Sequence, residues 1–329
     1  MRVGFIGLGN LGYRLANNLV VSNVETFIYD LKRDLGKELE EKGAVWMDSP
    51  QRVAESSDIC ITCLPSPEAV SIVLEGSDGL LKGLGPEKLW IEMSTTDSEE
   101  VIRLGRLAEG RGAKVVEAPV SGGCHRASTG NISILVGGNR DAFEVALPIL
   151  KIIGHKIIHV GEIGKASVLK VVTNFLASTH LVAIGEALMV CKRSGLDLGK
   201  AFKGIQASSG NSFVHETESQ VILSGSYNVN FTMELVYKDV GLFQNLVERL
   251  GIKADLSPLI TEIFREGRDT FGDKSWSTKI VKRLEDAKSL LRSTVPVARR
   301  VLGESHEITL KMRWAYAGAL YEDAGATLD

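Results

Sequence analysis

Short apolar segments alternate with amphipathic helical segments along the first half of the chain. The apolar segments are only a few residues long, which is typical of strands buried in a parallel sheet, whereas the segments between them have the period of a helix. This alternation predicts βαβ units and a mostly parallel sheet. Strands are expected at Val3–Ile6, Thr26–Tyr29, Ala44–Trp46, Ile59–Leu64, Leu89–Met93, Lys114–Glu117, Ile132–Val136 and Lys156–Val160.

A single long helix is expected from Gly164 to about Arg193. Apolar residues cover nearly its whole circumference, which predicts a helix that is buried on all sides. A membrane span is the competing interpretation, but Lys170 and Glu186 interrupt the apolar run, so we expect no membrane segment. The pattern instead favours a central helix between two domains.

The rest of the chain, from about 194 to 329, has helical periodicity without strand alternation. A length of 329 residues also favours two domains. We therefore predict an α/β protein with a Rossmann dinucleotide-binding domain over residues 1–162. An all-helical domain for substrate binding and dimerisation would follow over residues 163–329, joined to the first by the long helix.

A nucleotide-binding motif follows the first predicted strand. The segment GLGNLG places Gly7, Gly9 and Gly12 around Asn10 and Leu11, directly before a helical segment. In such a motif the first glycine permits a tight turn, the second allows close approach of a pyrophosphate, and the third allows the helix to pack on the sheet. The diphosphate then binds at the helix N-terminus.

Asp30 ends the second predicted strand, eighteen positions after Gly12. A carboxylate there accepts hydrogen bonds from the adenosine ribose hydroxyls and repels a 2′-phosphate. NAD is therefore the expected cofactor. NADP stays possible, because Lys32 and Arg33 could partly offset the repulsion.

Two further loops are expected beside the cofactor. Leu64 and Pro65 follow one strand, and Ser94 and Thr95 follow the next. The crevice beyond the carboxyl ends of parallel strands is where ligands bind in such sheets. Helices should start directly after both loops, with a Ser66 cap in one and a Thr96–Glu99 capping box in the other.

Composition narrows the classes of function. A net charge of −3 provides no basic excess for nucleic acid. The glycine motif begins so near residue 1 that a signal peptide is not expected, and four cysteines are too few for a disulfide framework. Cys60 and Cys63 have C-x-x-C spacing but lie in a predicted buried strand, so we expect buried thiols and no metal site. A cytoplasmic protein is predicted.

Three more segments complete a recognisable set: EAPVSGG at Glu117–Gly123, the pair Lys170 and Asn174 on one helical face, and FTMELVYKD at Phe231–Asp239. Together with the glycine motif they resemble the β-hydroxyacid dehydrogenase family, which includes 3-hydroxyisobutyrate dehydrogenases. The resemblance extends from residue 1 to about 285. It implies a C-terminal domain like that of 6-phosphogluconate dehydrogenases and a homodimer or homotetramer.

The resemblance implies a role for each segment. Lys170 would be the general acid/base and Asn174 would hold the substrate oxygen. Ser121, Gly122 and Gly123 would bind the carboxylate of a small β-hydroxy acid, a role that a turn rich in backbone N–H groups suits. Lys238 would reach the cofactor from the second domain. A burial-lowered lysine pKa would suit proton transfer at neutral pH.

The match departs from the family pattern at several positions. Glu117 stands where the family usually has Asp, and His125 and Arg126 directly follow the glycine pair. These two residues are either solvated surface groups or the sign of a more acidic substrate, such as a tartronate semialdehyde or sulfolactaldehyde. A non-catalytic nucleotide-sensing module is the alternative from another class, because a fold alone never establishes activity.

Overall fold

The computed structural model describes residues 1–284, 310 and 311. The chain divides into two compact units, Met1–Asn174 and Phe175–Asp329, which are called the N-terminal and C-terminal units here. The predicted domain boundary at residues 162 and 163 stays a prediction. The predicted helical tail beyond residue 284 lies almost wholly outside the described residues.

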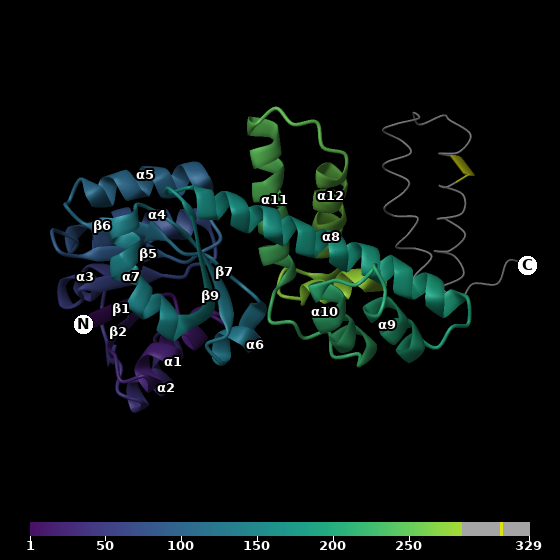
Figure 1. Cartoon of the computed structure of the whole chain (residues 1–329), viewed down its shortest axis with the longest axis horizontal. Coiled ribbons are helices and arrows are strands. Elements are labelled where there is room, and N and C mark those ends of the chain that lie inside the picture. Colours follow the sequence, from purple (N-terminus) through teal and green to yellow (C-terminus); the bar gives the residue numbers. More distant parts are fainter. Residues whose placement is uncertain (285–309, 312–329) are drawn as a thin grey trace, which may run out of the picture. The chain divides into compact units, whose positions relative to one another are not determined.

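A nine-stranded sheet forms the centre of the N-terminal unit (Figure 1). Its order is β3-β2-β1-β4-β5-β6-β8-β7, and β9 also pairs with β8. Strands β1 to β6 are parallel, whereas β8 runs antiparallel to β6 and β7. The strands are β1 (Arg2–Ile6), β2 (Glu25–Tyr29), β3 (Val45–Trp46), β4 (Ile59–Thr62), β5 (Leu89–Glu92), β6 (Lys114–Glu117), β7 (Val120–Ser121), β8 (Ile132–Gly137) and β9 (Gly154–Gly161).

Helices cover both faces of this sheet. Alternate strand residues point to opposite sides, and the strands carry apolar residues on both, so each face needs a covering layer. Phe5 of β1 packs into a core with α1 and α7, whereas its neighbour Ile6 packs into a separate core with α3, α4 and α5. The helices are α1 (Gly12–Val21), η1 (Arg33–Gly36), α2 (Lys37–Glu41), α3 (Pro50–Ser56), α4 (Pro67–Glu75), η2 (Leu80–Lys82), α5 (Ser98–Glu109), α6 (Gly123–Ser128) and α7 (Arg140–Ile153).

The C-terminal unit is helical over its described residues, apart from an isolated bridge between Thr232 and Trp276. Its core gathers around Phe264 and Met233, both completely buried. Helix α8 (Lys165–Arg193) begins in the first unit and ends in this one. The other elements are α9 (Leu198–Gln206), α10 (Phe213–Leu223), α11 (Met233–Arg249), α12 (Leu256–Phe271) and η3 (Ser277–Leu284).

The predicted fold class is confirmed: a Rossmann-like parallel sheet, a long helix and a helical second part. Strand β7 was not predicted, because its two residues lie inside the EAPVSGG motif and pair only with β8. Such a short edge strand has no periodicity of its own.

Two local predictions are wrong. Asp97, and not Thr96, caps α5, because its side chain accepts from the N–H groups of Glu99 and Glu100 at 2.8 and 3.2 Å. Helix α8 is not buried on all sides, since Leu176 and Val190 are 48% and 66% exposed. By length and composition α8 is apolar enough to cross a membrane, but such a helix is weak evidence for a span and 44% of its most apolar stretch is buried within the protein.

Candidate active site

Four neighbouring parallel strands end at the same level of the sheet. The register pairs Ile6 with Thr62, Thr62 with Glu92, and Glu92 with Glu117, and each is the last residue of its strand. The loops that follow β1, β4, β5 and β6 therefore leave the sheet at one edge. The first three of these loops carry the predicted glycine motif, Leu64-Pro65 and Ser94-Thr95. The segment after β6 leads into β7, whose last residue, Ser121, precedes Gly122 and Gly123.

The three glycines of the motif have different surroundings. Gly7 has a positive φ of 98°, and a Cβ there would collide with the carbonyl oxygen of Cys63. A Cβ at Gly12 would collide with the carbonyl oxygen of Gly7, so the two glycines hold the turn and the helix together. A Cβ at Gly9 meets nothing within 4 Å. An open glycine at the start of a helix fits a site that a diphosphate approaches closely.

Asp30 lies beside this loop and organises it. Its carboxylate accepts hydrogen bonds from the N–H of Leu8 at 2.7 Å and of Lys32 at 2.8 Å. Asp30 is half-buried, so a ribose can still reach the rim of the carboxylate. The glycine loop and the acidic residue, which are far apart in the sequence, are therefore joined by a direct hydrogen bond in one candidate nucleotide site.

The loops after β4 and β5 are joined directly. The Leu64 N–H donates to the Ser94 hydroxyl oxygen at 2.8 Å. Two cysteines lie nearby: Cys60 is fully buried, which raises its pKa to about 12, and Cys63 just beyond the strand is half-buried.

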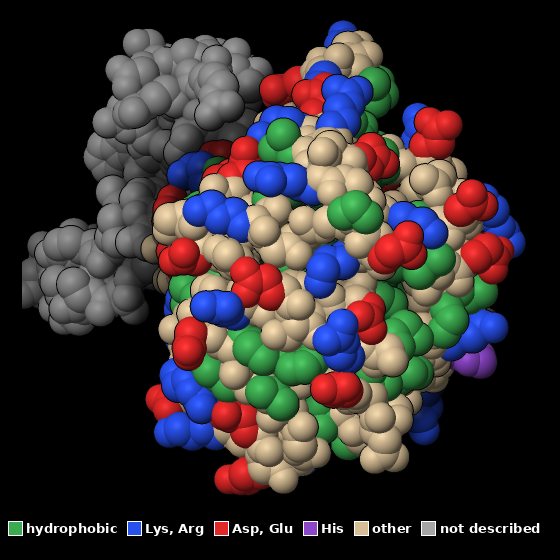
Figure 2. All heavy atoms as spheres, turned by 90° about the vertical axis from the view of Figure 1, so that its left-hand side faces the viewer, with side chains coloured by type: hydrophobic (Ala, Val, Ile, Leu, Met, Phe, Trp, Pro, Cys, Tyr) green, Lys and Arg blue, Asp and Glu red, His purple; other side chains and the backbone are tan. Residues whose placement is uncertain are grey.

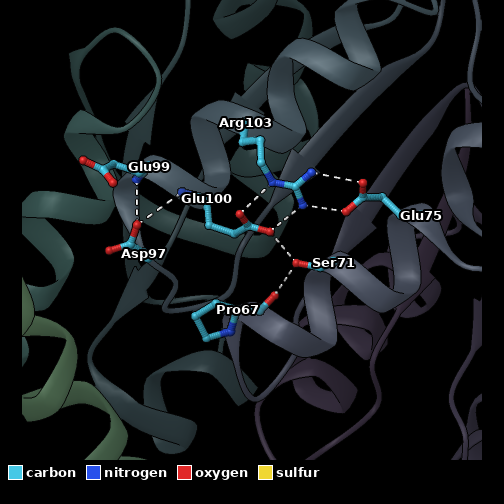
Figure 3. Close-up of polar contacts among 7 residues, drawn as sticks. All are labelled: Pro67, Ser71, Glu75, Asp97, Glu99, Glu100 and Arg103. Carbon is cyan, nitrogen blue, oxygen red and sulfur yellow. Dashed lines mark hydrogen bonds and ion pairs between the residues drawn. The ribbon is translucent and has the colours of Figure 1, made fainter.

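An ionic cluster ties together the helices that leave these two loops (Figure 3). Arg103 of α5 binds Glu75 of α4 through two hydrogen bonds of 3.0 and 2.5 Å, and it also binds Glu100 at 2.7 and 2.8 Å. The Glu100 carboxylate accepts from the hydroxyl of Ser71 on α4. These carboxylates hold the pKa of Arg103 above its usual range. The cluster fixes α4 against α5.

Ser121, Gly122 and Gly123 form a turn that only glycine favours. Gly122 and Gly123 have φ values of 130° and 76°, and Gly122 caps the short helix α6. Ser121 belongs to β7 and pairs with Ser133 of β8, which fixes the entrance of the turn. Arg126 packs over this turn, because a Cβ at Gly122 would lie 2.9 Å from its Cδ.

Lys170 and Asn174 are in contact on α8, as their spacing predicts. The Lys170 Nζ donates to Asn174 Oδ1 at 2.7 Å, and Lys170 is only 8% exposed. An ammonium so deeply buried requires polar partners, and Asn174 supplies one. Asn174 is the last residue of the N-terminal unit, so both residues belong to the same unit as the glycine motif.

Two buried acids at the strand ends received no role from the sequence. Glu92 and Glu117 are each fully buried, on adjacent strands. Burial raises the pKa of Glu92 to about 7 and also raises the pKa of Glu117. For Glu92 the only sequence signal was acidity at the end of an apolar strand, which a surface residue would show as well. Glu117 is the first residue of the EAPVSGG segment, but no role followed from that.

Lys238 lies on α11 in the C-terminal unit, and its predicted role toward the cofactor stays a prediction. Its Nζ forms an ion pair of 2.7 Å with Asp239, whose side chain is 3% exposed. Because the Asp239 carboxylate is so deeply buried, solvent screens this ion pair less than it screens a pair on the surface.

Charges of both signs are mixed on the face of the molecule that Figure 2 shows. Blue and red side chains alternate over it without a broad basic area. This face therefore lacks the basic patch that typically binds a nucleic-acid backbone. Among residues 1–284, 310 and 311, no three His, Cys, Asp or Glu side chains gather as a metal site.

Two family models match the chain. The NAD-binding domain of 6-phosphogluconate dehydrogenase matches residues 2–161, and the NAD-binding domain of NADP-dependent 3-hydroxyisobutyrate dehydrogenase matches residues 164–284.

Individual relatives agree with these models. The chain is 32% identical to 2-(hydroxymethyl)glutarate dehydrogenase of Eubacterium barkeri, over 82% of this chain and 89% of that protein. It is 34% identical to the mitochondrial 3-hydroxyisobutyrate dehydrogenase of Mus musculus, over 80% and 81%. A solved structure of Psf3 in complex with NADP+ and 2-OPP superposes with a TM-score of 0.81 at 27% identity, over 86% and 99%.

The open surroundings of Gly9 lead to a testable prediction. We expect Gly9→Ala to fold normally but to weaken NAD binding by about tenfold or more, because the added methyl group occupies the space of the diphosphate. Gly204→Ala on α9 is the matched control, since its Cβ also meets nothing within 4 Å. Titration of NADH fluorescence measures both variants, and equal affinities would show that no diphosphate approaches Gly9.

Proposed function

The chain belongs to the β-hydroxyacid dehydrogenase family and is an NAD(P)-dependent dehydrogenase, and we propose that it interconverts a small β-hydroxy acid and its semialdehyde or keto form. 3-Hydroxyisobutyrate is the model substrate. The observation that carries the proposal is the buried Lys170 amine, 2.7 Å from Asn174 in the unit that holds the dinucleotide motif.

Lys170 is the proposed general acid/base. In the oxidation its neutral amine takes the proton from the β-hydroxyl, and in the reduction its ammonium returns that proton to the oxygen. Burial disfavours the charged form of a lysine, and Lys170 is only 8% exposed, which supports a role as proton acceptor. Asn174 Oδ1 fixes the amine, and the amide NH2 group of the same side chain can donate to the substrate oxygen.

The cofactor and the carboxylate site complete the proposal. When bound, the nicotinamide takes up the hydride from the carbon that bears the hydroxyl group. The role of the protein there is to hold the dinucleotide by the glycine loop, Asp30 and the loops of Leu64-Pro65 and Ser94-Thr95. The N–H groups of the Ser121-Gly122-Gly123 turn would hold the substrate carboxylate, because backbone N–H groups in such turns suit anions.

NAD is the proposed cofactor in preference to NADP. Asp30 would place a negative charge against a 2′-phosphate. Arg33, the nearest guanidinium in the sequence, is already engaged: it lies 4.4 Å from the centre of the Trp46 ring and binds Glu40. That leaves Lys32 as the nearby cation that would offset the charge of Asp30, and its side chain is exposed.

A more acidic substrate is the second candidate. Arg126 packs against the glycine turn, where its guanidinium could bind a second carboxylate of the substrate. The relative from Eubacterium barkeri is named for a dicarboxylic β-hydroxy acid, 2-(hydroxymethyl)glutarate.

Location and assembly complete the proposal. Among the described residues no disulfide joins the four cysteines, which supports a reducing compartment such as the cytoplasm. The resemblance to the family supports a homodimer or homotetramer.

Lys170 yields the first functional prediction. We expect Lys170→Met to lower kcat by about a thousandfold while NAD affinity stays within about twofold, because the variant keeps the side-chain volume and removes the proton acceptor. Lys165→Met on the same helix, at an exposed position, is the control and should keep the wild-type rate. Absorbance at 340 nm measures the rate, and a Lys170→Met enzyme with most of its activity would rule out the assigned role.

Asp30 yields the second prediction. In Asp30→Ser the ratio of kcat/KM for NAD over NADP should fall about tenfold or more, because the repulsion of the 2′-phosphate is removed. The control is Asp34→Ser, a neighbouring exposed acid that pairs with Lys37. An unchanged ratio in Asp30→Ser would mean that Asp30 does not face the ribose.

The substrate class is tested with a pair of acids and one variant. Wild-type kcat/KM for 3-hydroxyisobutyrate and 2-(hydroxymethyl)glutarate decides between the monocarboxylic and the dicarboxylic class. If the dicarboxylate is preferred, Arg126→Ala should lower its kcat/KM by about ten- to a hundredfold and leave the monocarboxylate within about twofold. Equal losses for both acids would assign Arg126 to the shape of the turn alone. Binding of NAD without turnover of any acid would instead support a nucleotide sensor.

A further inference from the structure

Glu117 joins the end of a strand to the start of the helix that carries Lys170. Its Oε1 accepts from the N–H of Ala166 at 2.8 Å, and its Oε2 accepts from the N–H of Ser167 at 3.0 Å and from the Ser167 hydroxyl. Both N–H groups lie in the first turn of α8, where backbone donors have no partner within the helix. The carboxylate therefore satisfies donors that would otherwise be buried without partners.

Lys170 lies one turn beyond these contacts. In an α-helix the N–H of residue 170 bonds the carbonyl of residue 166, and residues three and four apart share a face. If Ala166 or Ser167 moves, the backbone of Lys170 therefore moves with it. The contact between Lys170 Nζ and Asn174 Oδ1 depends on the same turn.

The sheet provides a space for this carboxylate. Glu117 is paired with Gly137 of the antiparallel strand β8, and a Cβ at Gly137 would collide with Glu117 Oε1 and lie 2.9 Å from its Cγ. Only a glycine there leaves the side chain free to turn toward α8. Glu117 is fully buried, so its position is set by packing as well as by hydrogen bonds.

Glu92 is paired with Glu117 on the adjacent strand, and it contacts the end of β4 and the loop after β5. Its carboxylate accepts from the Ser94 N–H at 2.6 Å and from the Thr62 hydroxyl. Ser94 in turn accepts from the N–H of Leu64. The two acids thus support the loop after β5 and the lysine helix from adjacent strands, and, beside burial, the charge of Glu117 helps to raise the pKa of Glu92.

We infer that Glu117 is a positioning residue for Lys170: by capping the first turn of α8, its carboxylate holds the amine and Asn174 in the geometry that proton transfer requires. The inference rests on the role proposed for Lys170. It differs from a purely structural role, because loss of the cap changes the ionisation of Lys170 and the rate of proton transfer more than it changes cofactor binding.

The test compares Glu117→Gln, Glu117→Asp and the control Glu162→Gln. Glu162 is an exposed acid two residues before Gly164, so its variant removes the same charge near the start of α8 without removing a cap. The pKa of Lys170 is followed by the 13Cε chemical shift in lysine-labelled protein, with Lys170→Met to assign the signal. The pH profile of kcat, KM for NAD and the melting temperature are measured beside it.

In Glu117→Gln the pKa of Lys170 should fall by about half a pH unit or more, because a negative charge that favours the ammonium is lost. Its kcat should fall about ten- to a hundredfold, since misplacement of a reacting group by a fraction of an ångström is costly. KM for NAD should stay within about twofold. Glu117→Asp keeps the charge but is one methylene shorter, so it should recover part of kcat, whereas Glu162→Gln should match the wild type.

Two outcomes overturn the inference. One is a Glu117→Gln protein whose Lys170 titration and kcat match those of Glu162→Gln. The other is a loss of melting temperature and NAD affinity in parallel with kcat at an unchanged Lys170 titration, which marks a structural role only. If Glu117→Gln does not fold, Ser167→Ala takes its place, because it removes the hydroxyl that donates to Glu117; a wild-type Lys170 titration and kcat in that variant would then overturn the inference. If the wild type oxidises no hydroxy acid, the proposed function fails, and the Lys170 titration still decides whether Glu117 acts on the amine.

Discussion

The in-register ending of four parallel strands is the constraint on which the N-terminal unit depends. Hydrogen bonds continue past the strand ends, from Cys63 N to Ile6 O, from Met93 N to Thr62 O and from Ala118 N to Glu92 O. Because these contacts keep adjacent strand ends aligned, segments more than a hundred residues apart in sequence leave the sheet at one edge. The loops there owe their proximity first to this backbone pairing, and the bond between Leu64 and the Ser94 hydroxyl adds to it.

Two buried acids at that edge, Glu92 and Glu117, bind the segments that carry the proposed site residues. A buried carboxylate is costly unless donors surround it, and here Glu92 and Glu117 find donors in the loop after β5 and in the first turn of α8. The hydrogen bonds that stabilise these acids therefore also locate Ser94 and the helix of Lys170. Stability and the placement of the reacting groups depend on the same contacts.

The position of Lys170 on a helix rather than a loop has a consequence for its chemistry. A helix holds the lysine and Asn174 at a fixed spacing, so the 2.7 Å contact between them does not depend on loop conformation. Asp30, by contrast, lies directly after a strand and organises a loop through Leu8 and Lys32. The proposed proton-transfer group would thus be held by a helix and its cap, and the nucleotide by the loops at the edge of the sheet.

Much of this protein could be predicted from local pattern. Periodicity predicted every strand except β7, and the spacing of Lys170 and Asn174 predicted that they share one helical face, because both depend on residues that are neighbours along the chain. Tertiary structure alone decided that Glu117 caps α8 some fifty residues later and that Gly137 leaves room for it. It also decided that Asp97 takes the place of Thr96 as a cap and that Leu176 is exposed. Those outcomes depend on which surfaces meet when the chain folds. Periodicity describes only the spacing of residues along one element, so it does not predict these tertiary contacts.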